Sequence, residues 1–289
     1  MSRNPTLGIW LMIAAVASFA AQDGFARHLA ETYNTLMVVM VRYWVFAAFV
    51  IILALRRTEG LRAAVRSHRP VVHALRAVLL VSEICVIIWG YTLIGLIESH
   101  AVFAICPLLI AAFSGVFLGE KIIWQRWAAL GAGLLGVVVI LRPGMGVFTP
   151  AALLPLAAAL MFAIYSVLTR LTTREEPTFP AFFWPGVIGA VLMTGIGLPN
   201  WQPVALQDWP LLIIYAGISV FSHWLLLKCY EATEAARVQP YAYLQIVFVT
   251  LIGLMVYDET LAPLVAAGAA IVIAAGLYAL SLERKPQVT

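Results

Sequence analysis

Two stretches of the chain match each other at one constant offset: GYTLIGLIESHAVFAICPLLIAAFSGVFLGEK, residues 90–121, and CYEATEAARVQPYAYLQIVFVTLIGLMVYDET, residues 229–260. Tyr91 lies over Tyr230, and Glu120 lies over Glu259. In both stretches a nearly unbroken apolar segment ends at an acidic residue, and a short polar turn then leads into a segment rich in small residues. The segments AQDGFAR and IYSVLTR, which close the first and sixth apolar runs, correspond in the same way. The sequence therefore predicts an internal duplication.

The composition excludes a soluble globular protein. The chain has 289 residues, of which 63% are hydrophobic and only 11% are charged, whereas soluble proteins are about half apolar and about a quarter charged. Its apolar runs last roughly twenty residues, the length that a helix needs to cross a bilayer, and they lack the alternation of barrel strands. Because lipid offers no partner to backbone N–H and C=O groups, the sequence predicts an all-α integral membrane protein.

Ten such apolar runs divide the chain, and most connections between them are very short. The longest connection, residues 56–76, leaves no room for a soluble domain. The first run resembles a signal peptide, but the duplication favours a retained first helix. We therefore expect ten transmembrane helices, at approximately residues 7–26, 35–55, 74–95, 99–118, 126–142, 150–170, 179–198, 209–229, 238–257 and 262–282.

The odd number of helices in each half of the duplication has a topological consequence. With five spans in each half, residues 1–146 and 147–289, the second half must enter the membrane upside down relative to the first. The predicted fold class is therefore ten transmembrane helices arranged as two inverted five-helix repeats. Such repeats are a recurrent plan of secondary transporters, in which the substrate site lies near the bilayer midplane between the repeats.

Lysine and arginine residues predict the orientation. If the N-terminus is cytoplasmic, fifteen of the 18 Lys and Arg residues fall inside or at the inner surface, only Arg27 and Arg142 fall outside, and Arg42 lies within a span. This asymmetry follows the positive-inside rule, so we expect both termini to be cytoplasmic. The net charge of +4 then reflects this topology and contact with anionic lipid, and it predicts no nucleic-acid partner.

The pattern of ten helices, with halves that each end in an acidic residue, a short turn and a small-residue helix, resembles the EamA-type members of the drug/metabolite transporter superfamily. The resemblance covers nearly the whole chain. The second half departs from the first because Pro107 has no counterpart there, Pro240 being displaced towards the start of its helix. The residues that carry the resemblance are Gly119-Glu120-Lys121 with Gly131, Gly133 and Gly136, Asp258-Glu259-Thr260 with Gly268 and Gly276, and the helix-closing Arg27 and Arg170.

Within this family the chain is most similar to bacterial exporters of aromatic and other neutral amino acids. The resemblance implies a multi-pass protein of the bacterial inner (plasma) membrane that exports its substrate by alternating access through a central cavity between the repeats. Two alternatives stay open: a proton-coupled exporter of another small metabolite or drug, and a non-transport scaffold or receptor. The expected partners are a small-molecule substrate and membrane lipid, and the expected oligomeric state is a monomer or a homodimer.

Three ionisable residues lie well inside apolar spans, where an unpaired charge is costly. Asp23 and Arg42 fall in the outer half of the membrane at comparable depth, where they form a structural ion pair, an outer gate, or a clamp for a charged end of the substrate. Glu83 lies near the midplane. It is either a neutral carboxyl bonded to another helix or a residue that lines a water-filled pathway. In the repeat alignment Ser222 lies over Glu83, and His223 follows it.

Other polar and aromatic residues deep in the spans complete the predicted cavity. A pathway of aromatic residues with few charges suits a zwitterion with an apolar body, and it suits a polyanion such as a sugar phosphate poorly. Ser219 shares a helical face with His223 by its spacing. The predicted substrate-binding or cavity residues are Gln22, Glu83, Trp89, Tyr91, His100, Tyr165, Ser219, Ser222, His223, Tyr243 and Gln245.

The remaining features bound the chemistry and the packing. Pro107, Pro155 and Pro185 interrupt spans and are predicted helix bends for gating. Small residues along the fifth and tenth runs predict close helix packing between the repeats, or a dimer contact. The three cysteines lack metal-ligand spacing and are odd in number, so no metal, cofactor or disulfide framework is expected. The sequence also lacks the HExxH, paired-aspartate and serine–histidine patterns of intramembrane proteases, so an enzyme is not expected.

Overall fold

The protein is described here from a computed structural model over residues 5–57, 60–118, 123–141, 150–173, 176–232 and 241–283. Within these ranges every regular element is a helix, and no strand occurs. In chain order the elements are α1 (Pro5–Thr32), α2 (Thr35–Arg56), α3 (Gly60–Val65), α4 (Pro70–Ile94), α5 (Leu96–Phe103), α6 (Cys106–Leu118), α7 (Trp124–Leu141), η1 (Pro150–Ala152), α8 (Leu153–Thr173), α9 (Thr178–Gly197), η2 (Leu198–Asn200), η3 (Leu206–Asp208), α10 (Trp209–Ala232), α12 (Leu244–Val256) and α13 (Pro263–Glu283).

Seven helical stretches among the described residues are long and apolar enough to cross a membrane. They contain α1, α2, α4, α8, α9, α10 and the broken pair α5–α6. Three shorter apolar stretches lie within α7, α12 and α13, at Trp127–Leu141, Leu244–Val256 and Pro263–Ala279. The predicted class, an all-α multi-pass membrane protein, is confirmed at this level, while the ten crossings and the inverted repeat stay predictions.

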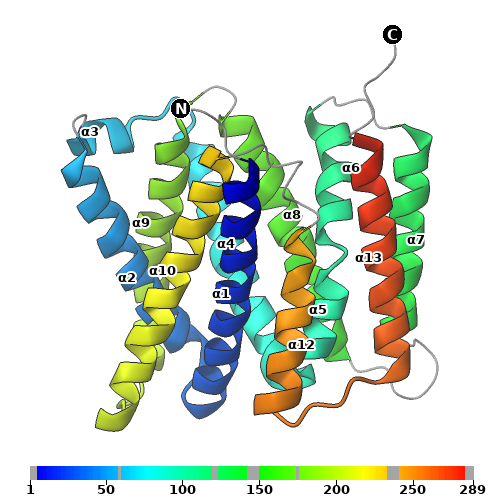
Figure 1. Cartoon of the computed structure of the whole chain (residues 1–289). Coiled ribbons are helices and arrows are strands. Elements are labelled where there is room, and N and C mark those ends of the chain that lie inside the picture. The colour runs from blue at the N-terminus through cyan, green and yellow to red at the C-terminus, as the bar shows by residue number, and fades with distance from the viewer. Residues whose placement is uncertain are drawn as a thin grey trace.

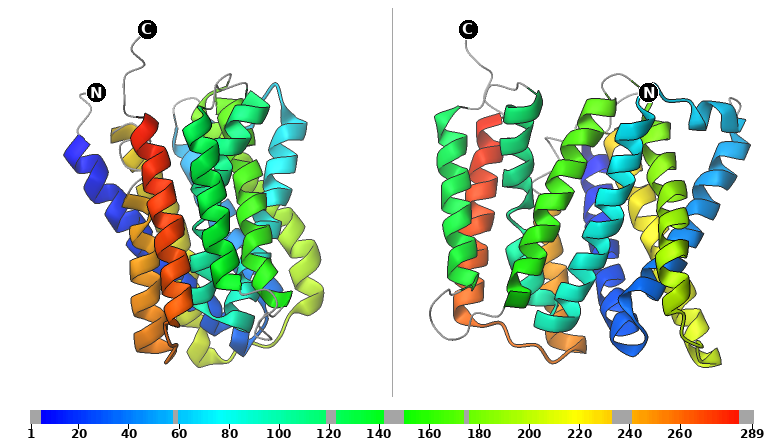
Figure 2. Two further views of the ribbon diagram at one scale, coloured as in Figure 1. Left: turned by 90° about the vertical axis from the view of Figure 1, so that its right-hand side faces the viewer. Right: turned by 180° about the vertical axis from the view of Figure 1, so that it is seen from behind.

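The long helices stand side by side in one bundle, and successive ones run in opposite directions (Figures 1 and 2). α1 begins and α13 ends at the same edge of the bundle, which is uppermost in Figure 1. We call this edge the terminal face and the opposite edge the far face. The α7–α13 pair stands at one side of the bundle and α2 at the other, so α1, α4, α8, α10 and α12 lie between them and enclose the interior.

Local sequence explains two of the turns at the far face. The Asn34 side chain accepts a hydrogen bond from the Met37 amide at 2.8 Å and caps α2, which satisfies one donor that the first helical turn leaves without an internal partner. Gly95 separates α4 from α5 with a φ of +86° and a ψ of 171°, a backbone conformation that is essentially restricted to glycine. Both turns reverse the chain and return it to the terminal face.

The three predicted helix-bending prolines occupy different positions. Pro185 lies inside α9, as expected. Pro107 is the second residue of α6, directly after the break at residues 104–105 that divides α5 from α6. Pro155 lies in the first turn of α8, where the missing N–H removes no internal hydrogen bond. Pro107 thus marks a break within its span, and the prediction of a bend is corrected for Pro155, which marks a helix start.

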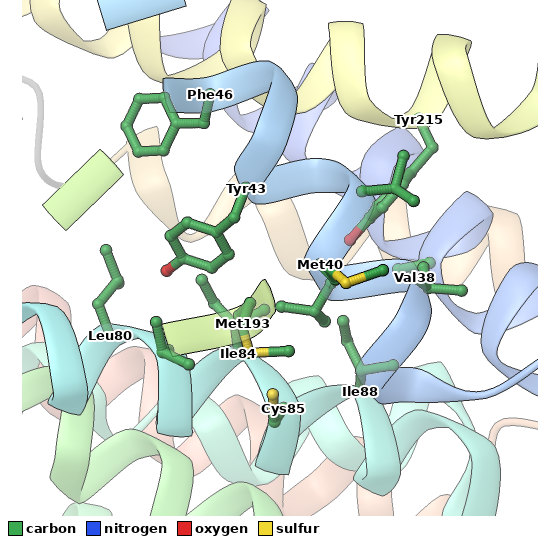
Figure 3. Close-up of a cluster of buried hydrophobic side chains, with 14 of the residues drawn as sticks. Val38, Met40, Tyr43, Phe46, Leu80, Ile84, Cys85, Ile88, Met193 and Tyr215 are labelled. Carbon is green, nitrogen blue, oxygen red and sulfur yellow. The ribbon is translucent and has the colours of Figure 1, made fainter. Parts of the chain in front are cut away.

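A cluster of buried apolar side chains fixes α2 against α4, α9 and α10 (Figure 3). Tyr43 and Met40 of α2 pack near Ile84 of α4, Met193 of α9 and Tyr215 of α10, and each of these five side chains is buried. Since lipid is as apolar as these side chains, close van der Waals packing, and not removal from water, stabilises such contacts. The cluster thereby positions Arg42, which lies between Val41 and Tyr43, beside α4 and α10.

The α7–α13 pair packs through two glycines. A Cβ added at Gly268 would lie 2.6 Å from the Gly136 carbonyl oxygen, and one added at Gly136 would lie 2.8 Å from the Gly268 carbonyl oxygen. The two backbones therefore approach each other more closely than any side chain would allow. Small residues predicted for close packing are used here to join the fifth apolar run to the tenth.

The variant Gly268→Ala is expected to lower the melting temperature of the purified protein. The added methyl group meets a backbone carbonyl that cannot rotate away, and overpacking of this kind costs about 1–3 kcal/mol. Gly131→Ala on α7 is the matched control, because a Cβ there meets nothing within 4 Å and alanine is favoured over glycine in a helix by about 1 kcal/mol. Equal melting temperatures for the two variants would contradict this contact.

Candidate functional site

A cavity of about 340 Å³ lies among α1, α2, α4, α5, α6, α8, α10 and α12. This volume falls within the range of small-molecule sites, about 300–1,000 Å³. Helical spacing explains the lining, because Glu83, Ile87 and Tyr91 of α4 recur every four residues and share one face. The lining residues with polar side chains are Gln22, Asp23, Arg42, Glu83, Tyr91, His100, Tyr165, His223, Tyr243 and Gln245.

Glu83 and Arg42 bring opposite charges into the cavity without pairing. Each is 6% exposed, and each lines the cavity. Among the described residues, no carboxylate lies within ion-pair distance of Arg42, and no hydrogen bond or ion pair joins Glu83 to another side chain. A carboxyl and a guanidinium buried in this way are costly unless a solute or water reaches them.

Asp23 is held by residues of three elements. Its Oδ2 atom accepts a hydrogen bond from Gln245 Nε2 at 3.2 Å and lies 3.1 Å from His100 Nε2, while its Oδ1 atom accepts a longer one from Gln22 Nε2 at 3.4 Å. These contacts join α1 to α5 and α12 at the end of the cavity nearest the far face. The ion pair with Arg42 that the sequence allowed is absent among the described residues, because Asp23 has these other partners; the gating role stays a prediction.

Three buried polar atoms around the cavity have no hydrogen-bond partner in the described part of the chain: Gln22 Oε1, His100 Nε2 and Tyr243 Oη. The His100 nitrogen is close to Asp23, but the direction of approach is not that of a hydrogen bond. Buried polar groups in proteins are nearly always satisfied. In this conformation the three atoms are covered, and the Tyr243 hydroxyl lies against Gly276 of α13, so a solute reaches them only after a side-chain movement.

Eight of the eleven residues predicted from sequence line this cavity; the other three are Trp89, Ser219 and Ser222. Trp89 is 41% exposed on the outer surface of α4, because six residues along a helix place it about 120° around the axis from Glu83. Ser222 donates to the Ile218 carbonyl at 2.8 Å, and it precedes His223 by a third of a turn. Ser219 is buried, and its carbonyl lies 2.8 Å from His223 Nδ1.

Several aromatic lining residues are not among those predicted from the sequence. Phe19, Phe103 and Phe162 also face the cavity. Phe103 follows His100 by three residues and Phe162 precedes Tyr165 by three, so each shares a helical face with a predicted cavity residue. That spacing is the signal by which they were recognisable.

A second polar cluster lies at the terminal face, and we call Glu176, His73 and Arg76 the terminal triad. Glu176 is 7% exposed, and the side chains of His73 and Arg76 are fully buried. Glu176 Oε1 accepts hydrogen bonds from Ser67 Oγ at 2.9 Å and from the amides of residues 68 and 69 at 2.7 and 3.1 Å. Its Oε2 atom lies 3.0 Å from His73 Nε2. The carboxylate thus holds the chain just before the start of α4.

Arg76 determines which nitrogen of His73 carries the proton. Arg76 Nη1 lies 2.8 Å from His73 Nδ1, and arginine has no acceptor atom, so Nδ1 must accept and Nε2 must donate to Glu176. The guanidinium also donates to Thr169 Oγ1 and to the Ala181 carbonyl, and lies 5.1 Å from the centre of the Tyr165 ring. Because Tyr165 lines the cavity, the triad connects the terminal face with the cavity wall.

Glu176 lies between α8 and α9, outside the apolar stretches. Burial alone would raise the pKa of its carboxyl, but hydrogen bonds from His73, Ser67 and the His68 amide outweigh burial, and the pKa lies below its ordinary value of 4.5. The carboxylate is therefore charged at neutral pH. It balances the buried charge of Arg76 through the neutral ring of His73.

The far face is held by another carboxylate, Glu259. Its oxygens accept hydrogen bonds from the amides of Leu96 at 2.7 Å and Ile97 at 2.9 Å, the first residues of α5. Arg27 Nη1 donates to the same carboxylate, and its guanidinium lies 4.1 Å from the centre of the Tyr257 ring. We call these contacts the far-face clasp; they join α1, α5 and the segment after α12. Glu120, the predicted counterpart of Glu259, lies outside the described residues.

Comparisons with known proteins agree with this arrangement. The sequence model of the EamA-like transporter family matches residues 6–142 and 149–281. A crystal structure of another protein superposes over the full length of both chains with a TM-score of 0.63 at 20% identity, a likeness that shows the fold alone.

Three curated relatives cover nearly the whole chain. The S-adenosylmethionine uptake transporter of Rickettsia prowazekii is 25% identical over 96% of this chain and 92% of its own length. The riboflavin transporter of Vibrio cholerae is 28% identical over 99% of this chain and 96% of its own. The pseudopaline exporter of Pseudomonas aeruginosa is 22% identical over 96% and 97%, respectively. All three are named as transporters, and none as an enzyme.

Proposed function

The chain belongs to the EamA-like transporter family, within the drug/metabolite transporter superfamily, and from this premise we propose that it moves small solutes that join an α-amino acid head group to a planar or apolar body. Aromatic and other neutral amino acids, exported from the cytoplasm, are the first substrates that we propose. The solute would cross by alternating access, through exposure of the cavity to one side of the membrane at a time.

The observation that carries this proposal is that the cavity contains two oppositely charged groups, neither of which forms an ion pair with a described residue. Glu83 offers a carboxyl and Arg42 a guanidinium to the same space. The ammonium and carboxylate of an amino acid would complete both, with charge-assisted hydrogen bonds that are roughly twice as strong as neutral ones. The volume of about 340 Å³ lies at the small end of the usual range of sites, which suits a solute of amino-acid size.

The architecture that we propose is ten crossings, arranged as inverted repeats at residues 1–146 and 147–289. In this arrangement α1, α2, α4 and α7 of the first repeat correspond to α8, α9, α10 and α13 of the second. The packing supports it, because replacing each helix of a contacting pair by its counterpart gives another pair that is also in contact. The pair α1–α10 becomes α8–α4, the pair α4–α9 becomes α10–α2, and the pairs α2–α9 and α7–α13 become themselves. The family model also matches the chain twice, at residues 6–142 and 149–281.

We propose that the terminal face is cytoplasmic and that the membrane is the inner membrane of a bacterium. The excess of lysine and arginine at that face supports the orientation, and the bacterial relatives support the membrane. The named relatives include both an uptake transporter and an exporter, so they do not decide the direction of transport. The outward direction that we propose rests on the resemblance of the sequence to amino-acid exporters.

A second candidate function is the uptake of S-adenosylmethionine. The Rickettsia relatives are named for it, and this solute carries an α-amino acid head and a planar ring. Its sulfonium adds a positive charge. The cavity holds two carboxyl groups, Asp23 and Glu83, against the single guanidinium of Arg42, and this excess suits such a cation.

Counterflow in proteoliposomes tests the proposal and separates the two candidates. Labelled tryptophan, phenylalanine and leucine should exchange, with unlabelled S-adenosylmethionine and riboflavin as competitors. Competition only by S-adenosylmethionine, with no exchange of the amino acids, would replace the first candidate by the second. Exchange of none of these compounds would contradict both.

The variant Glu83→Gln is expected to weaken the apparent affinity for amino acids by about one to two powers of ten, since the loss of one hydrogen bond to a charged group is worth about 1.5–3 kcal/mol. If Glu83 instead couples protons, the variant should still exchange labelled substrate and lose only its response to a pH gradient. A loss of stability with unchanged transport per folded molecule would identify a structural carboxyl. Unchanged transport, pH response and stability would remove all three roles.

A further inference from the structure

Five rings form a continuous row on one wall of the cavity. Tyr91 stacks on His100 with centroids 5.2 Å apart, His100 meets Phe103 at 6.4 Å, Phe103 meets Phe162 at 6.0 Å, and Phe162 meets Tyr165 at 5.8 Å. All five line the cavity. They come from α4, α5 and α8, so three separate elements contribute to one surface, which we call the aromatic wall.

The aromatic wall keeps ring surface free in its middle. Tyr91 and His100 are buried at the end next to Asp23, whereas Phe103, Phe162 and Tyr165 are only half-buried. The rings of Phe103 and Phe162 are tilted against each other by 56°, so they do not cover each other's faces. Aromatic pairs prefer such offset or edge-to-face arrangements, and a third ring from a solute can extend the same pattern.

The wall also has a defined position relative to the charged groups. Its His100 end lies 3.1 Å from Asp23, and its Tyr165 end lies beneath the Arg76 guanidinium of the terminal triad. Glu83 occupies the same face of α4 as Tyr91, eight residues earlier, and both line the cavity. A solute whose head group binds Glu83 and Arg42 therefore has the aromatic wall beside it for its body.

We propose that the aromatic wall is the specificity-determining surface of the transporter, at which Phe103 and Phe162 bind the planar ring of the solute and favour aromatic over aliphatic bodies on the same head group. The inference rests on the proposed function for the head group, but the ring contact itself requires only a planar solute. An aromatic pair contributes about 0.5–1.5 kcal/mol beyond simple burial, so each ring is worth about a two- to tenfold preference.

The test is direct binding to the purified full-length protein with three probes: L-tryptophan, L-leucine and adenosine, which has a planar ring but no amino acid head. Phe162→Leu and Phe103→Leu should each weaken binding of tryptophan by about two- to tenfold and leave binding of leucine unchanged. Phe162→Tyr, which keeps the ring, should restore the preference. Phe221→Leu is the matched control, because Phe221 is 50% exposed, stacks on Trp224 and lies outside the cavity.

The outcomes separate this inference from the proposed function. If the unmodified protein binds adenosine but neither amino acid, the head-group proposal fails, and the wall is then tested by the effect of Phe162→Leu on adenosine. If tryptophan and leucine both bind and Phe162→Leu and Phe103→Leu weaken them equally, or change neither, the wall only fills space and the inference is overturned. Because the two phenylalanines lie on different elements, a folding defect in one variant leaves the other to decide.

Discussion

The variant Glu176→Gln is expected to be among the least stable single variants of this protein. The carboxylate accepts hydrogen bonds from Ser67, two backbone amides and His73, and it balances the fully buried Arg76. Glu176 reaches Arg76 only through the ring of His73, so removal of its charge should cost no more than the lower end of the about 3–5 kcal/mol that the loss of one partner of a direct buried ion pair costs. Since glutamine keeps an acceptor oxygen for the amides, we expect about 3 kcal/mol, measured as a lower melting temperature in detergent or lipid.

The pH dependence of stability gives an independent readout for Glu176. Its pKa in the folded protein lies below the ordinary value of 4.5, so the folded state releases the proton more readily than the unfolded state. The stabilisation from this group is therefore fully present above pH 4.5 and is lost as the pH falls through the lower, folded-state pKa. The melting temperature of the unmodified protein should fall more steeply below pH 4.5 than that of Glu176→Gln.

Glu31→Gln is the control for this prediction. Glu31 pairs with Arg27 at 2.8 Å, but its side chain is 40% exposed, and exposed pairs contribute about 0–1 kcal/mol. A decrease in melting temperature for Glu176→Gln no larger than that for Glu31→Gln would show that the terminal triad adds little to stability.

The sequence predicts Glu83 as a cavity residue, and Arg42 as part of an ion pair or gate, because both are charged residues in apolar surroundings. A charged side chain inside a run of about twenty apolar residues has few physical explanations, and most of the deep polar residues that were selected on this ground do line the cavity. This difference in polarity identifies polar residues inside a span, but it cannot identify apolar ones. Phe103 and Phe162 are apolar residues among apolar residues, so composition does not distinguish a ring that faces the cavity from one that faces lipid, and only their three-residue spacing from His100 and Tyr165 does.

The terminal triad could not be predicted from the sequence, for a different reason. Glu176 lies in a polar connection, where a carboxylate is ordinary, and His73 and Arg76 fall in the longest connection, residues 56–76, before the third span. In the structure α4 begins at Pro70, so both side chains lie inside the bundle. There the Thr169 hydroxyl and the Ala181 carbonyl accept hydrogen bonds from the guanidinium of Arg76. Depth in the membrane likewise did not reveal that Asp23 faces α5 and α12 and not Arg42, because depth says nothing of which helices are neighbours.

Gly95→Ala is expected to open the far face. A Cβ at this position would lie 2.6 Å from Glu259 Oε1, the oxygen that binds the Leu96 amide and Arg27. The glycine also has a φ of +86°, and a side chain there is strained by about 1–3 kcal/mol. Alanine must therefore displace Glu259, rotate the backbone, or both, and each response breaks the far-face clasp between α1, α5 and the segment after α12.

A loss of 1–3 kcal/mol from one conformation shifts its population by about 5- to 150-fold, so the effect is expected to be large and measurable. In a background without Cys85, Cys106 and Cys229, a cysteine at Gln22 in the cavity should react with an impermeant thiol reagent from the far face much faster when Gly95 is replaced. Glu259→Gln, which removes the charge that binds Arg27, should act in the same direction.

Gly60→Ala separates backbone strain from the clasp. Gly60 also has a positive φ, +68°, but a Cβ there meets nothing within 4 Å, and α3 lies at the terminal face. It should lower stability without changing the labelling of the cavity from the far face. If Gly95→Ala labels no faster than Gly60→Ala, the clasp does not close this end, and the closure must then rest on Asp23, whose contacts with His100 and Gln245 lie one helical turn closer to the cavity.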